Sequence, residues 1–155
     1  MARNVDTSKE LIRVSLASIN DYQRIHEIDT LTNISPWTME QVESSFKAGH
    51  VAIKATINKV LAGFLIYEPI ISEAHLLSIA VDPIFQSKGV GKILLKTFLD
   101  QAKAQDLDII YLEVRKSNST AIAFYHSFGF KTDAIRVAYY TKPKSEDALL
   151  MSLLV

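Results

Sequence analysis

The spacing of hydrophobic residues changes several times along the chain, and each change predicts a new element. Residues 11–16, Leu-Ile-Arg-Val-Ser-Leu, predict a first strand. Ser18 is a favourable N-cap, and the apolar residues after it recur at helical intervals: Ile19, Tyr22, Ile25 and Ile28. Thr38 and Gln41 have the spacing of a capping box, so they predict a second helix, which Gly49 would end.

From residue 51 the pattern becomes that of strands. Apolar residues alternate over 51–57, and Asn58-Lys59 predicts a tight turn into the next strand, over 60–67. Residues 74–81 form an almost continuous apolar run that stops at Asp82-Pro83. Such a run predicts a strand buried on both faces.

The second half of the chain mixes both patterns. A strongly amphipathic helix is predicted over 90–104, a strand over 108–114, and a short helix over 120–128 that Gly129 closes. Two late strands, 130–135 and 147–154, are expected to be joined by a long loop that carries Tyr139 and Tyr140. The order predicts a mixed α/β fold, and residues 1–155 are expected to form a single domain.

Composition narrows the function. The chain has 155 residues, 17 basic and 17 acidic side chains, and no cysteine. The charge balance gives no global field for nucleic acid or an anionic membrane. The lack of cysteine excludes a thiol nucleophile and a disulfide. Residues 1–10 are polar and no run reaches the roughly 20 apolar residues of a membrane span, so a cytoplasmic location is expected.

The four histidines have no metal-ligand spacing, so no metal is expected, and each is interpreted as a surface or packing residue. They are His26, His50, His75 and His126.

The most informative segment is 86–91, Gln-Ser-Lys-Gly-Val-Gly, between the apolar run and the amphipathic helix. Glycines carry no Cβ, so backbone N–H groups can approach an anion there, and the helix start adds unpaired donors. These features predict a diphosphate site; a glycine turn without a ligand is the alternative. Leu94 replaces the third glycine of a Rossmann fingerprint. Gln86 and Ile93 stand where a P-loop needs Gly and Ser/Thr.

The segment Gln86-x-x-Gly89-x-Gly91 resembles the coenzyme A pyrophosphate loop of the GNAT superfamily of N-acetyltransferases. The preceding residues 78–83 resemble the family strand that diverges from its neighbour, and the resemblance continues through 112–118 and 121–130. It implies a mostly antiparallel sheet flanked by helices, with a splayed central strand pair that binds acetyl-CoA as co-substrate.

Within the superfamily the chain is most similar to the RimI group, which acetylates protein N-termini, typically the N-terminal alanine of a small-subunit ribosomal protein. Pro36-Trp37, Leu112-Glu113-Val114-Arg115 and Tyr139-Tyr140 carry this similarity. The expected acceptor is therefore a protein N-terminal peptide. A small amine, a polyamine or a lysine stays open as acceptor, and so does a coenzyme A-binding module without catalysis. The oligomeric state stays unknown.

The resemblance also implies roles for single residues. Glu113 matches the general base, although alone it also fits an outward strand-end carboxylate. Tyr125 matches the general acid that protonates the thiolate, although it also fits a core tyrosine. Trp37, Tyr139 and Tyr140 are candidates for the peptide groove, with packing as their alternative.

The donor side is expected to use three sets of groups. Backbone groups of Ile79, Ala80 and Val81 would bind the pantetheine arm and hold the thioester oxygen. The diphosphate would contact the turn residues and flanking lysines: Gln86, Ser87, Lys88, Gly89, Val90, Gly91 and Lys92. Asn118 would bind the coenzyme, cap a helix, or do both. Without cysteine, direct transfer in a ternary complex is expected.

Overall fold

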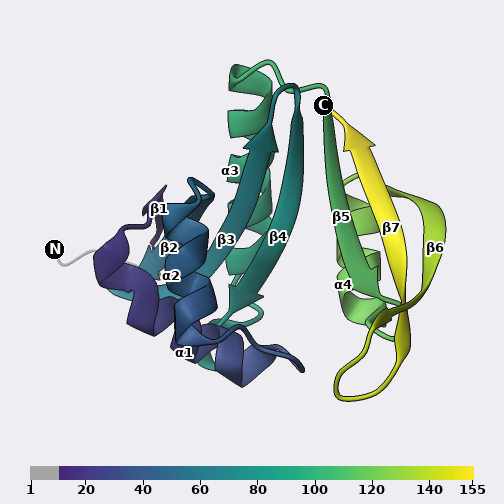
Figure 1. Cartoon of the computed structure of the whole chain (residues 1–155). Coiled ribbons are helices and arrows are strands. Elements are labelled where there is room, and N and C mark those ends of the chain that lie inside the picture. Colours follow the sequence, from purple (N-terminus) through teal and green to yellow (C-terminus); the bar gives the residue numbers. More distant parts are fainter. Residues whose placement is uncertain (1–10) are drawn as a thin grey trace, which may run out of the picture.

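Seven strands form one sheet in the order β1-β2-β3-β4-β5-β7-β6 in the computed structural model, which describes residues 11–155 (Figure 1). All neighbouring strands are antiparallel except β4 and β5, which are parallel. The strands are β1 (Ile12–Leu16), β2 (Val51–Ile57), β3 (Val60–Ile70), β4 (Glu73–Val81), β5 (Ile109–Arg115), β6 (Lys131–Tyr140) and β7 (Glu146–Leu154). The expectation that residues 1–10 hold no targeting segment lies outside the described residues.

In the described part of the chain, four α-helices cover the two faces of the sheet: α1 (Tyr22–Thr32), α2 (Met39–Lys47), α3 (Val90–Ala104) and α4 (Ser119–Ser127). Figure 1 shows α1 and α2 on one face of the sheet and α3 and α4 on the other. The predicted order of elements is therefore confirmed, and so is the mixed α/β fold. Within residues 11–155, no helix is long and apolar enough to cross a membrane.

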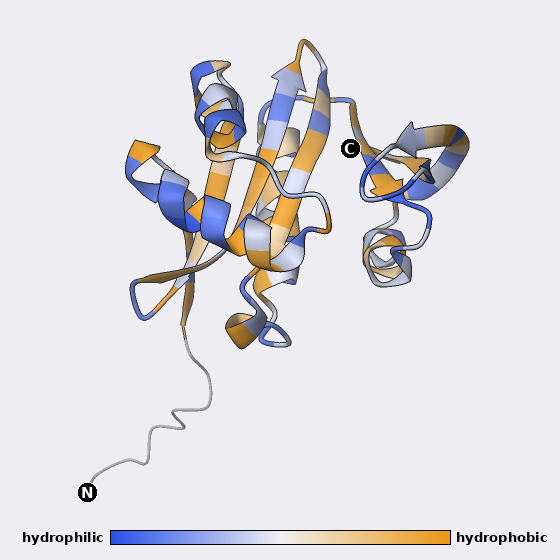
Figure 2. Ribbon diagram, turned by 60° about the horizontal axis from the view of Figure 1, so that its bottom comes forward, coloured by the Kyte–Doolittle hydropathy of each residue, from blue (hydrophilic) through white to orange (hydrophobic). Residues whose placement is uncertain are grey.

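Among the described residues, two apolar cores form, one on each face of the sheet, because successive side chains of a strand point to opposite faces. The larger core lies between the sheet and α3, and the smaller core lies between the sheet and the helices α1 and α2. Phe64 and Ile66 of β3 face α1 and α2, whereas Leu65 and Tyr67 face α3. Hydrophobic residues, orange in Figure 2, accordingly gather on the strands and on the helix sides that face them. Full burial of one such side chain contributes about 1.5–3 kcal/mol.

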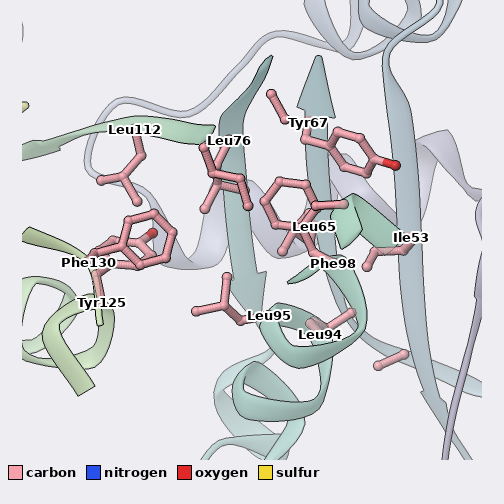
Figure 3. Close-up of a cluster of buried hydrophobic side chains, with 14 of the residues drawn as sticks. Ile53, Leu65, Tyr67, Leu76, Leu94, Leu95, Phe98, Leu112, Tyr125 and Phe130 are labelled. Carbon is pink, nitrogen blue, oxygen red and sulfur yellow. The ribbon is translucent and has the colours of Figure 1, made fainter. Parts of the chain in front are cut away.

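Helix α3 anchors the larger core. Leu94, Leu95 and Phe98 are fully buried, and Figure 3 shows them turned toward Leu65 and Leu76 of the sheet. These positions follow the 3.6-residue period that predicted the helix. This packing fixes the N-terminus of α3, which begins at Val90, against the end of β4.

The sheet opens between β4 and β5. The two strands pair only where Glu73–His75 meet Ile109–Tyr111, and Figure 1 shows them diverging from there. A register shift between Ile66 and Tyr67 leaves Leu77 as an extra residue in β4, and such bulges bend a strand. The resemblance to a fold with a splayed strand pair is thus confirmed.

Two local predictions are wrong. Residues 77–81 are half-buried rather than buried on both faces, because β5 does not accompany this part of β4. Ser18 precedes a 3-10 turn over Ile19–Asp21, and α1 begins only at Tyr22. Because the 3-10 turn has three residues per turn, Ile19 leaves the apolar face and is 69% exposed.

The long loop expected around Tyr139 and Tyr140 is also wrong, because β6 extends to Tyr140. Almost every residue of β6 is exposed, so no alternation of buried and polar positions marks this strand in the sequence. Its pairing with β7 is interrupted between Arg136 and Tyr140. The tyrosine pair therefore lies on an irregular edge strand.

Candidate active site

The turn before α3 has the backbone shape that an anion site needs. Gly89 has φ +85° and ψ +11°, in the left-handed region, and is the N-cap of α3. Ser87 also has a positive φ, of 64°. The first N–H groups of a helix have no intrahelical partner, so the start of α3 presents free donors. The turn itself, from Gln86 to Gly89, is exposed.

A cavity of about 310 Å³ lies at this helix start. Its walls include most of the predicted turn together with one α4 side chain: Val81, Phe85, Gln86, Ser87, Gly89, Val90, Gly91, Lys92 and Phe124. A Cβ on Gly91 would stand 3.7 Å from the Phe124 ring, so a side chain there would narrow the cavity. The volume of this cavity, the unpaired N–H groups at the helix start and the positive charge of Lys92 together suit a ligand that carries phosphate groups.

Asp82 ties the start of this loop to the first helix. Its carboxylate accepts hydrogen bonds from the Arg24 guanidinium at 2.5 Å and from the Ile84 N–H at 3.0 Å. Burial acts to raise the pKa of Asp82, but these bonds outweigh it and lower the pKa. The sequence offered no sign of this ion pair, because Arg24 and Asp82 are 58 positions apart.

The part of β4 that leads to the turn has a free edge. Ile79, Ala80 and Val81 pair with Leu65, Phe64 and Gly63 of β3 on one side. On the other side no strand of the described chain pairs with them, so their outward backbone groups can bind an extended ligand. The residues predicted to bind the acetyl donor are therefore continuous in the structure, because the open edge of β4 leads directly into the turn.

Glu113 lies across the opening, on β5. Its side chain is 21% exposed, and one carboxylate oxygen, Oε2, forms a short hydrogen bond with Nε2 of His75 on β4. Its two neighbours along the strand, Leu112 and Val114, are buried in the core, so the Glu113 side chain lies on the opposite face of the sheet. His75 is thus more than the surface or packing residue expected from the sequence.

A second cavity, of about 260 Å³, surrounds this pair. It lies where β4 and β5 begin to diverge, and its lining includes Ile70, Glu73, His75, Tyr111, Glu113 and Leu150. It shares no lining residue with the cavity at the helix start. The opening thus has an acidic side at β5 and an anion-binding side at α3.

Tyr125 is 8% exposed and packs in the larger core, against Phe124 and Phe130 at ring-centre distances of 5.6 and 5.7 Å. Figure 3 shows it beside Phe130. Burial raises the pKa of Tyr125 well above its usual value near 10, and the nearby Tyr140 adds to this. The phenol therefore stays protonated at every physiological pH. Both descriptions offered by the sequence, core residue and proton donor, are compatible with this position.

Tyr140 lies near enough to both predicted catalytic groups to interact with them electrostatically. Burial raises its pKa to about 12, and Tyr139 and Glu113 contribute further. The Arg115 guanidinium lies 4.1 Å from the centre of its ring and also donates to Glu146 and to the Lys142 carbonyl. Tyr139, by contrast, is 41% exposed.

The remaining candidates have visible structural contacts. Asn118 caps α4 through a hydrogen bond from the Ala121 N–H at 3.1 Å. Trp37 packs on the core beneath α1 and α2, and its backbone N–H donates to the carboxylate of the buried Asp29. The structure does not bring Trp37 into either cavity lining. Lys88 lies in the exposed turn but outside the lining of its cavity.

Among residues 11–155, no cluster of three or more His, Asp or Glu suits a metal ion.

The sequence matches the family model described as the acetyltransferase (GNAT) family over residues 22–130. The chain belongs to the GNAT family. It is therefore an acetyl-transferring enzyme, and the resemblance seen in the sequence is confirmed. The matched region begins at α1 and ends after α4, so it contains the turn, both diverging strands, Glu113 and Tyr125.

Two kinds of relative agree with this assignment. The ribosomal protein bS18-alanine N-acetyltransferase of Salmonella typhimurium is 35% identical over 141 residues, which cover 90% of this chain and 95% of that protein. The crystal structure of the ribosomal-protein-S18-alanine N-acetyltransferase from Escherichia coli has a TM-score of 0.88 and 33% identity, with 94% of each chain covered. Ard1 from Thermoplasma volcanium has a TM-score of 0.86 and 26% identity, with 93% of this chain and 97% of that chain covered.

Proposed function

We propose that this GNAT enzyme transfers the acetyl group of acetyl-CoA to the α-amine of a protein N-terminus, and that its acceptor is the N-terminal alanine of a small-subunit ribosomal protein. The observation that carries the proposal is the opening between β4 and β5, with an anion-binding turn at one end and Glu113 on its other side. The names and coverage of the relatives support the choice of acceptor.

The donor side is assigned to β4 and the turn. Backbone N–H groups at the start of α3 bind the diphosphate, with Lys92 adding charge. The free edge of β4 at Ile79, Ala80 and Val81 pairs with the pantetheine arm. A backbone N–H there stabilises the oxygen of the thioester as negative charge develops on it.

The proton chemistry is assigned to Glu113 and Tyr125. The Glu113 carboxylate takes a proton from the acceptor's ammonium, directly or through water, and so produces the neutral amine that attacks the thioester. Tyr125 donates a hydrogen bond to the sulfur as thiolate forms. The raised pKa of Tyr125 makes it a weaker acid than a free phenol, so it stabilises the thiolate by this hydrogen bond. When Tyr125 gives its proton to the sulfur, it takes a replacement proton from solvent.

The α-amine of a peptide is an acceptor that a mild base such as the Glu113 carboxylate can deprotonate. Its pKa is about 8, against about 10.4 for lysine, so at neutral pH a few hundred times more of it is in the reactive form. The peptide is assigned to the acidic cavity around Glu113. Tyr140, which lies close enough to Glu113 for that charge to raise its pKa, and the adjoining Tyr139 are assigned to the peptide as well, although neither lines this cavity. Trp37 holds the α1–α2 segment in place. We place this one-domain enzyme in the cytoplasm, where ribosomal proteins are made.

The test is mass spectrometry of the products formed with acetyl-CoA and a panel of peptides. The peptides differ only in their first residue, and each carries one internal lysine. The expected product is acetylated on the α-amine, with alanine-first peptides reacting fastest. Acetylation confined to lysine side chains would favour the alternative acceptors, and no transfer to any amine would contradict the proposal.

A further inference from the structure

His75 is the nearest ionisable neighbour of the assigned base. Parallel pairing of β4 with β5 places His75 opposite Tyr111, and Glu113 lies two residues further along β5 on the same face of the sheet. Nε2 of the imidazole then reaches Oε2 of Glu113. This bond ties together the two strands at the point where they begin to separate.

The ionisable groups around His75 come from three strands. Glu68 is its cross-strand partner on β3, Glu113 and Tyr111 face it from β5, and Glu73 lies two residues before it on β4. The hydrogen bond to Glu113 raises the pKa of His75, burial opposes this, and the charges of Glu113 and Glu68 raise it further. Through Glu113, Tyr140 on β6 also belongs to this group.

The cavity shows what this arrangement does to the carboxylate. One oxygen of Glu113 is occupied by His75, and both side chains line the same cavity of about 260 Å³. A carboxylate on a single-bonded side chain turns freely unless a partner holds it. With Oε2 held by the imidazole, Oε1 is the oxygen left for an incoming amine.

Resting on the proposed function, we infer that His75 is a positioning residue: its Nε2–H holds Oε2 of Glu113 so that Oε1 faces the acceptor amine, and its charge state governs the proton-accepting power of Glu113. When His75 is an imidazolium, Glu113 is half of an ion pair and accepts a proton poorly. When His75 is neutral, the hydrogen bond remains and the carboxylate accepts a proton readily. Acetyl transfer therefore increases as pH rises and His75 loses its proton.

The two parts of this role are separated by two variants. His75→Gln keeps an N–H donor near the position of Nε2 but cannot ionise, whereas His75→Leu removes both. At pH 8, we expect His75→Gln to keep kcat within about fivefold and His75→Leu to lose at least about tenfold, which is the lower part of the range for acid–base groups. KM for acetyl-CoA should change less than about twofold in both, because the donor side does not include His75.

The pH profile provides the readout that a purely structural role would not change. Saturating peptide is used from pH 5.5 to 9, and the ionisation of the substrate amine is common to all variants. We expect His75→Gln to have a flatter acidic limb than wild type. His50→Gln is the matched control, because His50 also lies near a glutamate, Glu68 at 3.7 Å, but not near Glu113. Its profile should match wild type.

A wild-type pH profile in His75→Gln, or a wild-type kcat in His75→Leu, would overturn the inference while leaving the proposed function intact. The absence of transfer by wild-type enzyme would instead refute the proposed function. If either variant fails to fold, NMR titration of the His75 imidazole in wild type and Glu113→Gln decides. A fall in the His75 pKa on removal of the carboxylate is expected, and an unchanged value would overturn the inference.

Discussion

Gly63 on β3 offers a sharp test of how the donor side is built. It pairs with Val81, at the end of the free edge of β4. A Cβ added at Gly63 would lie 2.9 Å from the Ala80 carbonyl oxygen, 3.0 Å from Cγ1 of Val90 and 3.3 Å from Cδ1 of Leu94. The carbonyl belongs to the backbone and cannot rotate away. Gly63→Ala must therefore displace β4 or the start of α3.

Overpacking of this kind costs about 1–3 kcal/mol. A protein of this size loses roughly 2–4 °C in Tm per kcal/mol, so calorimetric melting of Gly63→Ala should occur about 2–12 °C below wild type. The displaced groups, Ala80 and Val90, are assigned to the donor site, so titration calorimetry should show acetyl-CoA binding weakened by roughly tenfold, since small misplacements have large effects.

Gly91→Ala is the matched control for stability only, because Gly91 itself lines the donor cavity. Its Cβ would meet the Phe124 ring at 3.7 Å, an ordinary contact, and alanine favours a helix over glycine by up to about 1 kcal/mol. Its Tm should equal or exceed that of wild type. If Gly63→Ala melted at the wild-type temperature with unchanged acetyl-CoA affinity, the close packing of β3, β4 and α3 would not support the donor site as described.

Three further predictions concern the proton chemistry and the anchoring ion pair. Glu113→Gln should lower kcat/KM by about 10²–10³ at pH 7, and this defect should shrink toward pH 9, where the α-amine is already neutral; a defect independent of pH would remove Glu113 as base. Tyr125→Phe should lower kcat about a hundredfold with acetyl-CoA affinity and Tm nearly unchanged; an unchanged turnover would leave Tyr125 a core residue. Asp82→Asn should cost about 1.5–3 kcal/mol at pH 7 in chemical denaturation, because Arg24 loses its charged partner. Since the folded-state pKa of Asp82 is lowered, its contribution is full above the usual pKa of about 4 and disappears at lower pH, so the two stabilities should converge there; a constant difference would contradict the assigned cause.

Elements with strong local signals could be predicted from the sequence. The capping box of α2 is present, with Thr38 and Gln41 bonded reciprocally at 2.8 and 3.1 Å. Asn58 and Lys59 both have positive φ, as a two-residue hairpin turn requires. The apolar period of α3 likewise predicted its buried face. In each case, residues only a few positions apart determine the structure.

Features that depend on distant partners could not be predicted. Whether residues 77–81 are covered depends on where β5 stops following β4, and the bulge at Leu77 leaves no mark in the hydrophobic pattern. The pairing of His75 with Glu113 follows from a parallel register between strands 38 positions apart. The family resemblance led to Glu113 and Tyr125 because each is a named position of a local motif, whereas His75 is the unspecified position of the motif Glu73-Ala74-x-Leu76.

Titration of the purified protein with acetyl-CoA, followed by calorimetry, tests the central claim most directly. The account predicts one site per chain, with affinity lost when Gly89, whose left-handed backbone shapes the turn, is replaced by valine in a variant that still folds. Wild-type protein that releases no heat with acetyl-CoA, or a folded Gly89→Val variant that binds as tightly as wild type, would contradict the claim that this turn holds the donor's diphosphate.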